Sequence, residues 1–284
     1  MNKKNLFTLG RRVEPKYFPN QLLIIIVTLA FVAGIILHFF KVNTISDSLI
    51  NGFFLAITTF FTWALAREVY PQGEYAALFA SISVIITLLW FGIYSSIVVI
   101  LMWFIISLRL INQTTGINAT KIDMSIILVF SLVCAYIFSW FFLVFCAIIF
   151  FVNYSFTKDR TYIYFQIPVF LAIIVIVKYQ DMYYNLSLLN IQNLLFIGSL
   201  SVIFIIMMWL NRNFYVICDY SKTKVPPTRI LCGQILFIVF IFCYSIWFGD
   251  RSIISLIPIW CILIVSIIFS PMKILFHSYG QQLK

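Results

Sequence analysis

The chain has 284 residues, of which 63% are hydrophobic and only 10% are charged. A soluble domain is about half apolar and about a quarter charged, so a water-soluble globule of this composition would expose far too much apolar surface. The net charge is +10, but the basic residues stand between apolar runs and do not gather on one face or tail. This arrangement is typical of membrane topology and argues against nucleic-acid binding.

Cysteine and histidine usage gives no sign of a metal or cofactor. The six cysteines form no C-x-x-C pair and mostly lie inside apolar runs, as small buried hydrophobic residues do, so a disulfide or zinc framework is poorly supported. The two histidines, His38 and His277, are far apart in the chain, which does not suggest a metal site or a haem ligand pair. We therefore expect no metal and no cofactor.

The chain begins with a polar, basic segment, residues 1–20. The apolar run after it is about 20 residues long, enough for one membrane span. That run lacks the small-x-small motif of a cleavage site. It is therefore predicted to be a retained first span and not a removed signal peptide.

Six spans can be recognised directly, because a span needs about 20 mostly apolar residues. They are Gln21–Phe40, Ile45–Ala66, Tyr162–Val177, Leu186–Leu210, Ile230–Phe248 and Ser252–Phe269.

Two further apolar runs, Tyr75–Ile111 and Met124–Phe156, are too long for one helix each. A single helix over either run would extend about 50 Å, whereas the hydrocarbon core is about 30 Å thick. We divide each run into a hairpin of two short spans. The first break is predicted at residues 91–96, where Gly92 can end a helix in the left-handed conformation. The second is predicted near residues 139–140, without glycine or proline.

The basic residues test this ten-span count. With the N-terminus inside, the cytoplasmic segments hold sixteen of the 19 Lys and Arg residues, and the outer loops hold only Lys41, Lys178 and Arg251. If both long runs were single helices, Arg109 and Lys121 would move outside, and the split would become fourteen to five. The positive-inside rule therefore favours ten spans, with eight as the alternative.

The predicted fold is an all-α, polytopic transmembrane helical bundle with both termini in the cytoplasm. Residues 21–270 form one transmembrane domain, and residues 271–284 form a cytoplasmic tail. We expect the protein in the cytoplasmic membrane of a prokaryote. Its expected partners are the lipid bilayer and an anionic lipid or small-molecule substrate. The sequence leaves the oligomeric state open.

The predicted spans carry no charged residue at their centres, and all nine acidic residues lie in loops or at span ends. Charged groups inside a bilayer are costly and usually functional. Their absence argues against a buried carboxylate relay and against an enzyme that relies on paired carboxylates within the membrane.

A polar stripe in the second span is the first candidate site. Residues at helical spacing share one face there, and they are Ser48, Asn51, Leu55, Thr58 and Thr62. The stripe leads toward Arg67, Glu68 and Glu74. We expect it to line a substrate path whose cytoplasmic mouth holds these charges, since a polar stripe cannot face lipid cheaply. Alternatively, the hydroxyl and amide groups join neighbouring helices by hydrogen bonds, and Arg67 anchors the span at the interface.

The loop between residues 211 and 229 is the second candidate site. Its charged members are Arg212, Asp219, Lys222, Lys224 and Arg229. Such a group could hold a phosphate or an anionic lipid head group. The alternative is ordinary positive-inside charge near the inner leaflet.

Three functions remain open from the sequence. The leading hypothesis is a carrier or flippase for a small or amphipathic molecule, in which Arg67 binds an anionic group, Glu68 and Glu74 pair with it or gate access, and Asn51, Thr58 and Thr62 line the path. The second is a membrane-embedded enzyme that holds a lipid-linked substrate through the loop at 211–229. The third is a non-catalytic assembly factor. No catalytic residue can be named, and a non-enzymatic role is favoured.

Overall fold

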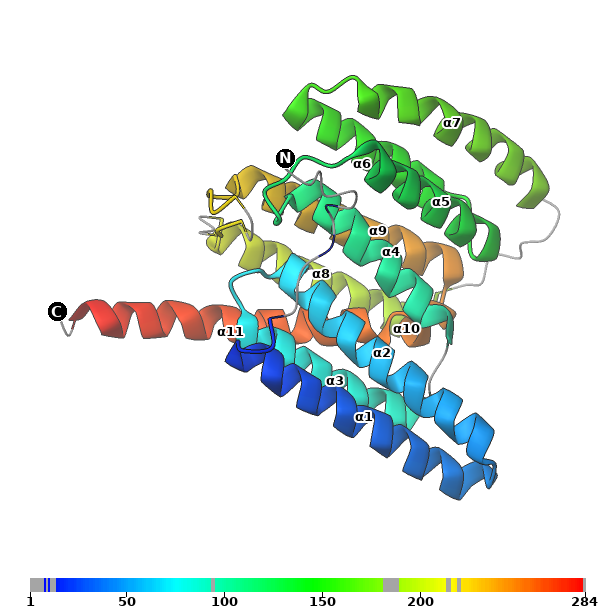
Figure 1. The fold of residues 1–284 in the computed structure, drawn as a ribbon, viewed down its shortest axis with the longest axis vertical. Helices are drawn as coiled ribbons and strands as arrows, with labels where there is room; N and C mark the ends of the chain where they lie inside the picture. The colour runs from blue at the N-terminus through cyan, green and yellow to red at the C-terminus, as the bar shows by residue number, and fades with distance from the viewer. Residues whose placement is uncertain are drawn as a thin grey trace, which may run out of the picture. The chain divides into compact units, whose positions relative to one another are not determined.

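A computed structural model describes residues 8, 10, 14–92, 95–180, 189–212, 216–218 and 221–282, and this part of the chain is helical without a strand. The all-α prediction is therefore confirmed. The helices (Figure 1) are α1 (Phe18–Val42), α2 (Ile45–Val69), α3 (Glu74–Phe91), α4 (Ser95–Asn112), α5 (Lys121–Ile137), α6 (Phe141–Thr157), α7 (Thr161–Gln180), α8 (Ile191–Leu210), α9 (Pro227–Phe248), α10 (Arg251–Ser255) and α11 (Ile257–Gln282).

Both long apolar runs are divided into two helices. α3 ends at Phe91, and Gly92 follows with φ 97°, a conformation that glycine adopts without steric cost. α5 ends at Ile137, and α6 begins at Phe141. The two breaks lie where the sequence predicted them.

Several predicted span ends differ from the helix ends, among them the start of α8 and the course of the last span. α8 begins at Ile191, because the Asn190 side chain accepts a hydrogen bond from the Gln192 amide and caps the helix there. The predicted start of this span, Leu186, lies outside the described residues. The last span is interrupted at Leu256. Pro258 then falls in the first turn of α11, where its missing N–H leaves no hydrogen bond unmade.

Within the described part of the chain, five helices are long and apolar enough to cross a membrane: α1, α2, α3, α8 and α9. Shorter apolar helices cover Ile97–Asn112, Phe141–Thr157, Thr161–Val177 and Ile257–Ser270. Large hydrophobic side chains such as Leu29 and Ile174 are exposed, whereas polar ones such as Thr58 and Ser131 are buried. Hydrocarbon is the solvent in which this distribution is stable.

The chain forms two compact units. The first comprises Met1–Arg12, Met102–Leu186 and Tyr215–Phe240, and so contains α5, α6, α7 and the adjoining parts of α4 and α9. Its interior is aromatic: the Trp103 ring lies 5.1 Å from Phe142 and 5.0 Å from Phe240, centroid to centroid.

The second unit comprises Val13–Leu101, Ser187–Phe214 and Ile241–Lys284. In it α1, α2 and α3 lie side by side, and α11 contacts α2, α3 and α8 (Figure 1). α1 and α2 cross closely, because a Cβ added at Gly34 would lie 2.8 Å from the Gly52 Cα. Paired glycines allow this approach, as is common between membrane helices.

Candidate functional site

The predicted polar stripe of α2 is almost entirely buried within the second unit. Ser48, Leu55, Thr58 and Thr62 are all 0% exposed, as is the neighbouring Thr59. Asn51 is half-buried. The stripe therefore faces protein and not lipid, as its polarity requires.

The hydroxyls of the stripe differ in how they are satisfied. Thr59 donates to the Leu55 carbonyl and Thr62 donates to the Thr58 carbonyl, each at 2.7 Å. The Thr58 hydroxyl is buried and has no hydrogen-bond partner within the described part of the protein. A buried hydroxyl left without a partner costs about 1–3 kcal/mol, which makes Thr58 a place where a water or a ligand group would be stabilised.

Charged residues gather where the stripe ends. Arg67 Nη2 lies 3.6 Å from Glu74 Oε1, and the Arg67 guanidinium lies over the Trp63 ring, 5.3 Å from its centroid. The Tyr17 hydroxyl donates a hydrogen bond to the other carboxylate oxygen of Glu74. Glu68 is buried at 1% exposure in the same turn of α2 as Arg67.

This cluster unites three helix ends: the start of α1, the end of α2 and the start of α3. The Arg67 side chain is 12% exposed and Glu74 is 36% exposed, so the pair lies at the rim of the unit. Burial and the carboxylate of Glu74 raise the pKa of Tyr17, which keeps its phenol protonated as the donor.

Two members of the cluster were missed by the sequence reasoning. Trp63 could have been found, since it precedes Arg67 by four residues and the two therefore share one helix face. Tyr17 is 57 residues from Glu74, and nothing local indicates their contact.

Of the loop residues predicted to bind a head group, the structure describes Arg212, Lys222, Lys224 and Arg229. Lys222 and Lys224 are exposed in a turn, whose end is closed by a bridge between Ile217 and Lys224. Arg212 is exposed in the second unit, with its guanidinium 5.8 Å from the Trp209 ring. Asp219 lies outside the described residues.

Arg229, in contrast, is turned into the first unit at 6% exposure. Its Nη1 donates to the Ile111 carbonyl at 2.9 Å and to Asn153 Oδ1 at 3.4 Å. The guanidinium also lies over the Phe156 ring, 4.6 Å from its centroid. Arg229 therefore joins the end of α4, the end of α6 and the start of α9.

The described helices have the character of a multi-pass membrane protein, with an all-helical fold and several segments apolar enough to span a bilayer. Within the described residues, no three His, Cys, Asp or Glu side chains come together as metal ligands. No protein family, curated protein or solved structure is detectably similar to the chain. Function must therefore be argued from the residues themselves.

Proposed function

We propose that this protein is a membrane carrier or flippase for an amphipathic molecule with an anionic group, and that Arg67 binds that group. The observation that carries the proposal is the Arg67–Glu74 pair at the end of the buried hydroxyl stripe of α2. An arginine at this position supplies a planar set of donors suited to phosphate or carboxylate.

The electrostatics of the cluster suit exchange of one anion for another. The Arg67–Glu74 contact, at 3.6 Å, is longer than a charge-assisted hydrogen bond of about 2.8 Å. Glu74 is also held by Tyr17. An incoming anionic group can therefore take the place of Glu74 beside Arg67 while Tyr17 stabilises the displaced carboxylate. Glu74 acts in this scheme as a gate.

The stripe supports passage along α2. From Arg67 to Asn51 the helix rises about 24 Å, close to the thickness of the hydrocarbon core. Thr58 and Thr62 lie between these ends, and the unpartnered hydroxyl of Thr58 offers a donor and an acceptor on the way. In the same proposal the chain spans the membrane ten times, with both termini in the cytoplasm.

Lipid translocation in proteoliposomes tests the proposal. The protein is reconstituted into phosphatidylcholine vesicles that carry a trace of fluorescent phosphatidylglycerol, and dithionite quenching follows movement between leaflets. Loss of one charged hydrogen bond is worth about 1.5–3 kcal/mol, so Arg67→Gln should slow translocation about tenfold or more. Arg67→Lys should restore part of the rate.

Two further variants separate a functional effect from a folding effect. Thr58→Val removes an unpartnered hydroxyl, so it should keep or raise the thermal stability while it slows translocation. Arg251→Gln changes an exposed cation remote in sequence from the stripe and should leave the rate unchanged. A well-folded Arg67→Gln protein that translocates as fast as the wild type would contradict the proposal.

Two other functions make different predictions in the same experiments. A membrane-embedded enzyme for lipid-linked substrates would lose turnover on Lys222→Gln and keep it on Arg67→Gln. An assembly factor would tolerate both changes and co-purify with another membrane protein. The buried position of Arg229 at 6% exposure favours the carrier over the enzyme, because its contacts with Ile111 and Asn153 are those of a residue that ties helices together.

A further inference from the structure

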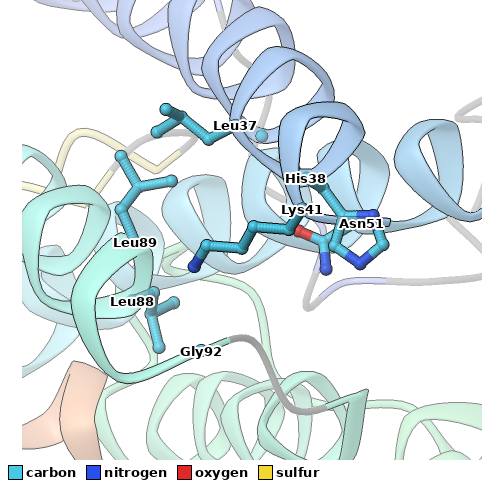
Figure 2. A pocket seen from close by; sticks show the side chains of 8 residues that line it. Leu37, His38, Lys41, Asn51, Leu88, Leu89 and Gly92 are labelled. Atoms are coloured by element: carbon cyan, nitrogen blue, oxygen red, sulfur yellow. The ribbon is translucent and has the colours of Figure 1, made fainter. Parts of the chain in front are cut away.

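A pocket of about 80 Å³ lies at the opposite end of α1, α2 and α3 from Arg67. Its walls are the C-terminal part of α1, the end of α3 and Asn51 of α2. In Figure 2 the Lys41 side chain extends from α1 toward Leu88 and Leu89 of α3. Space of this size holds several water molecules, and so fits a group as large as a carboxylate or a phosphate.

Three polar side chains line this pocket, and each can donate a hydrogen bond. Lys41 brings a full positive charge, and His38 and Asn51 bring ring and amide N–H groups. None of the described residues that line the pocket is acidic. Asp47 precedes Asn51 by one helical turn, but it is exposed and its carboxylate already accepts a hydrogen bond from the Thr44 hydroxyl at 2.6 Å.

One effect opposes an anion here. The C-terminal ends of α1 and α3 carry partial negative charge. Both ends are partly satisfied, because the Asn43 amide donates to the Phe39 carbonyl and the Gly92 amide donates to the Leu88 carbonyl, each at 2.9 Å. The full positive charge of Lys41 exceeds the partial negative charge that remains at these two helix ends, since each helix end is equivalent to about half a charge.

Asn51 connects this pocket with the site described above. It belongs to the polar stripe of α2, one turn before the buried Leu55 and two turns before Thr58. The stripe therefore has cationic groups at both ends, Lys41 at one and Arg67 at the other, with buried hydroxyls between them.

We propose that the pocket of His38, Lys41 and Asn51 is a second subsite for an anionic group, at the outer end of the path whose inner end is Arg67. This inference rests on the proposed carrier function. The ligand chemistry is a phosphate or carboxylate, which a lipid head group or a free anion could supply.

Protection of Lys41 from an amine-reactive ester tests the subsite. The protein is placed in phosphatidylcholine nanodiscs, and acylation of Lys41 is followed by mass spectrometry of its peptide. In one arm inorganic phosphate is added, and in the other the nanodiscs contain phosphatidylglycerol. Simple mass action predicts that an occupant at twice its dissociation constant slows Lys41 acylation about threefold.

Two controls test whether the protection of Lys41 comes from an occupant of the pocket. Lys158 is exposed at the end of α6 and should be acylated equally in all conditions, so it corrects for surface charge. Asn51→Leu should abolish protection of Lys41 without unfolding the protein, because it replaces a half-buried amide by an apolar side chain of similar size.

The two arms identify the source of the anion. Protection by phosphate indicates a free anion, and protection only with phosphatidylglycerol indicates a lipid head group. Equal acylation of Lys41 in every condition, or protection that persists in Asn51→Leu, would overturn the subsite. If translocation still depends on Arg67 in that case, the proposed function survives without it. Protection of Lys41 in a protein that translocates no probe would support the subsite and contradict the carrier.

Discussion

Two buried charged side chains of the first unit, Asp123 and Arg229, bind backbone groups of segments distant in the chain. Asp123, at 0% exposure, caps the start of α5 and also accepts hydrogen bonds from the amide and hydroxyl of Thr8, at 3.1 and 2.7 Å. Arg229 likewise donates a hydrogen bond to the Ile111 carbonyl at the end of α4. These side chains are buried and shielded from water, so each contact stabilises one particular arrangement of helix ends.

Arg229→Gln should therefore destabilise the protein. The change leaves the Ile111 carbonyl without its donor and removes the cation from the Phe156 ring. We expect a loss of about 2–3 kcal/mol in the free energy of unfolding, measured by denaturant unfolding in detergent micelles. Lys222→Gln, at an exposed position of the same loop, should change it by less than about 0.5 kcal/mol. Equal effects of the two changes would show that Arg229 contributes no special contact.

Close helix contact depends on glycine only where two backbones meet. A Cβ at Gly52 would lie 2.7 Å from both the Phe31 carbonyl oxygen and Ile35 Cγ1 of α1. At Gly198 in α8, a Cβ would have nothing within 4 Å. The same residue type therefore has a packing role in α2 and none that is visible in α8.

Gly52→Ala and Gly198→Ala form a matched pair. Gly52→Ala should force α1 and α2 apart and lower the free energy of unfolding by about 1–3 kcal/mol. Gly198→Ala should leave it unchanged or raise it by up to about 1 kcal/mol, because alanine is the better helix former. Thermal and denaturant unfolding measure the stability of the two variants. A Gly52→Ala protein as stable as the wild type would refute the close crossing of α1 and α2.

Asp250 joins the start of α8 to the end of α9. Its carboxylate accepts hydrogen bonds at 2.8 Å from the Asn190 amide and from Asn193 Nδ2. These bonds, the Asn190 amide first, hold the pKa of Asp250 below its ordinary value of 3.8. A carboxyl whose pKa is lower in the folded state stabilises that state above the unfolded pKa, and the contribution is lost as the pH falls through the folded value.

Acidification to pH values below 3.8 should therefore weaken the junction of α8 and α9. Hydrogen exchange of the Asn190 amide, followed as the pH is lowered, should accelerate beyond its intrinsic pH dependence in the wild type. In Asp250→Asn this extra acceleration should disappear, since the amide oxygen still accepts but does not titrate. An identical pH dependence in both proteins would exclude Asp250 as its source.

The contacts between helix ends bear on how many times the chain crosses the membrane. An eight-span path would put the end of α4 outside and the end of α6 and the start of α9 inside. Yet Arg229 of α9 bonds both Ile111 of α4 and Asn153 of α6. Thr8 and Asp123 are also in contact, although the eight-span path places them on opposite faces. From these contacts we propose ten spans in place of eight.

Cysteine accessibility at Asn118 distinguishes the two paths. Asn118 is exposed between α4 and α5. In a background without the six native cysteines, Asn118→Cys should resist a membrane-impermeant maleimide in intact cells and react after permeabilisation. Lys41→Cys and Arg251→Cys should react in intact cells. Labelling of position 118 from outside would favour eight spans, and labelling of position 222 from outside would overturn the orientation.

The helical class, most helix boundaries and both hairpin breaks were predictable from the sequence, because they depend on local hydropathy and on single residues such as Gly92. The buried stripe of α2 was predictable for the same reason: hydroxyls at helical spacing must avoid lipid. The segments apolar enough to cross a membrane follow from the same local pattern.

The partners of the polar residues were not predictable. Apolar side chains suit lipid and protein neighbours equally, so the hydropathy pattern does not say which helix faces which. The pairing of Tyr17 with Glu74, the inward turn of Arg229, and the pocket shared by Lys41 and Leu88 each depend on that choice. Such contacts join residues distant in the chain, and only packing of the whole helices brings them together.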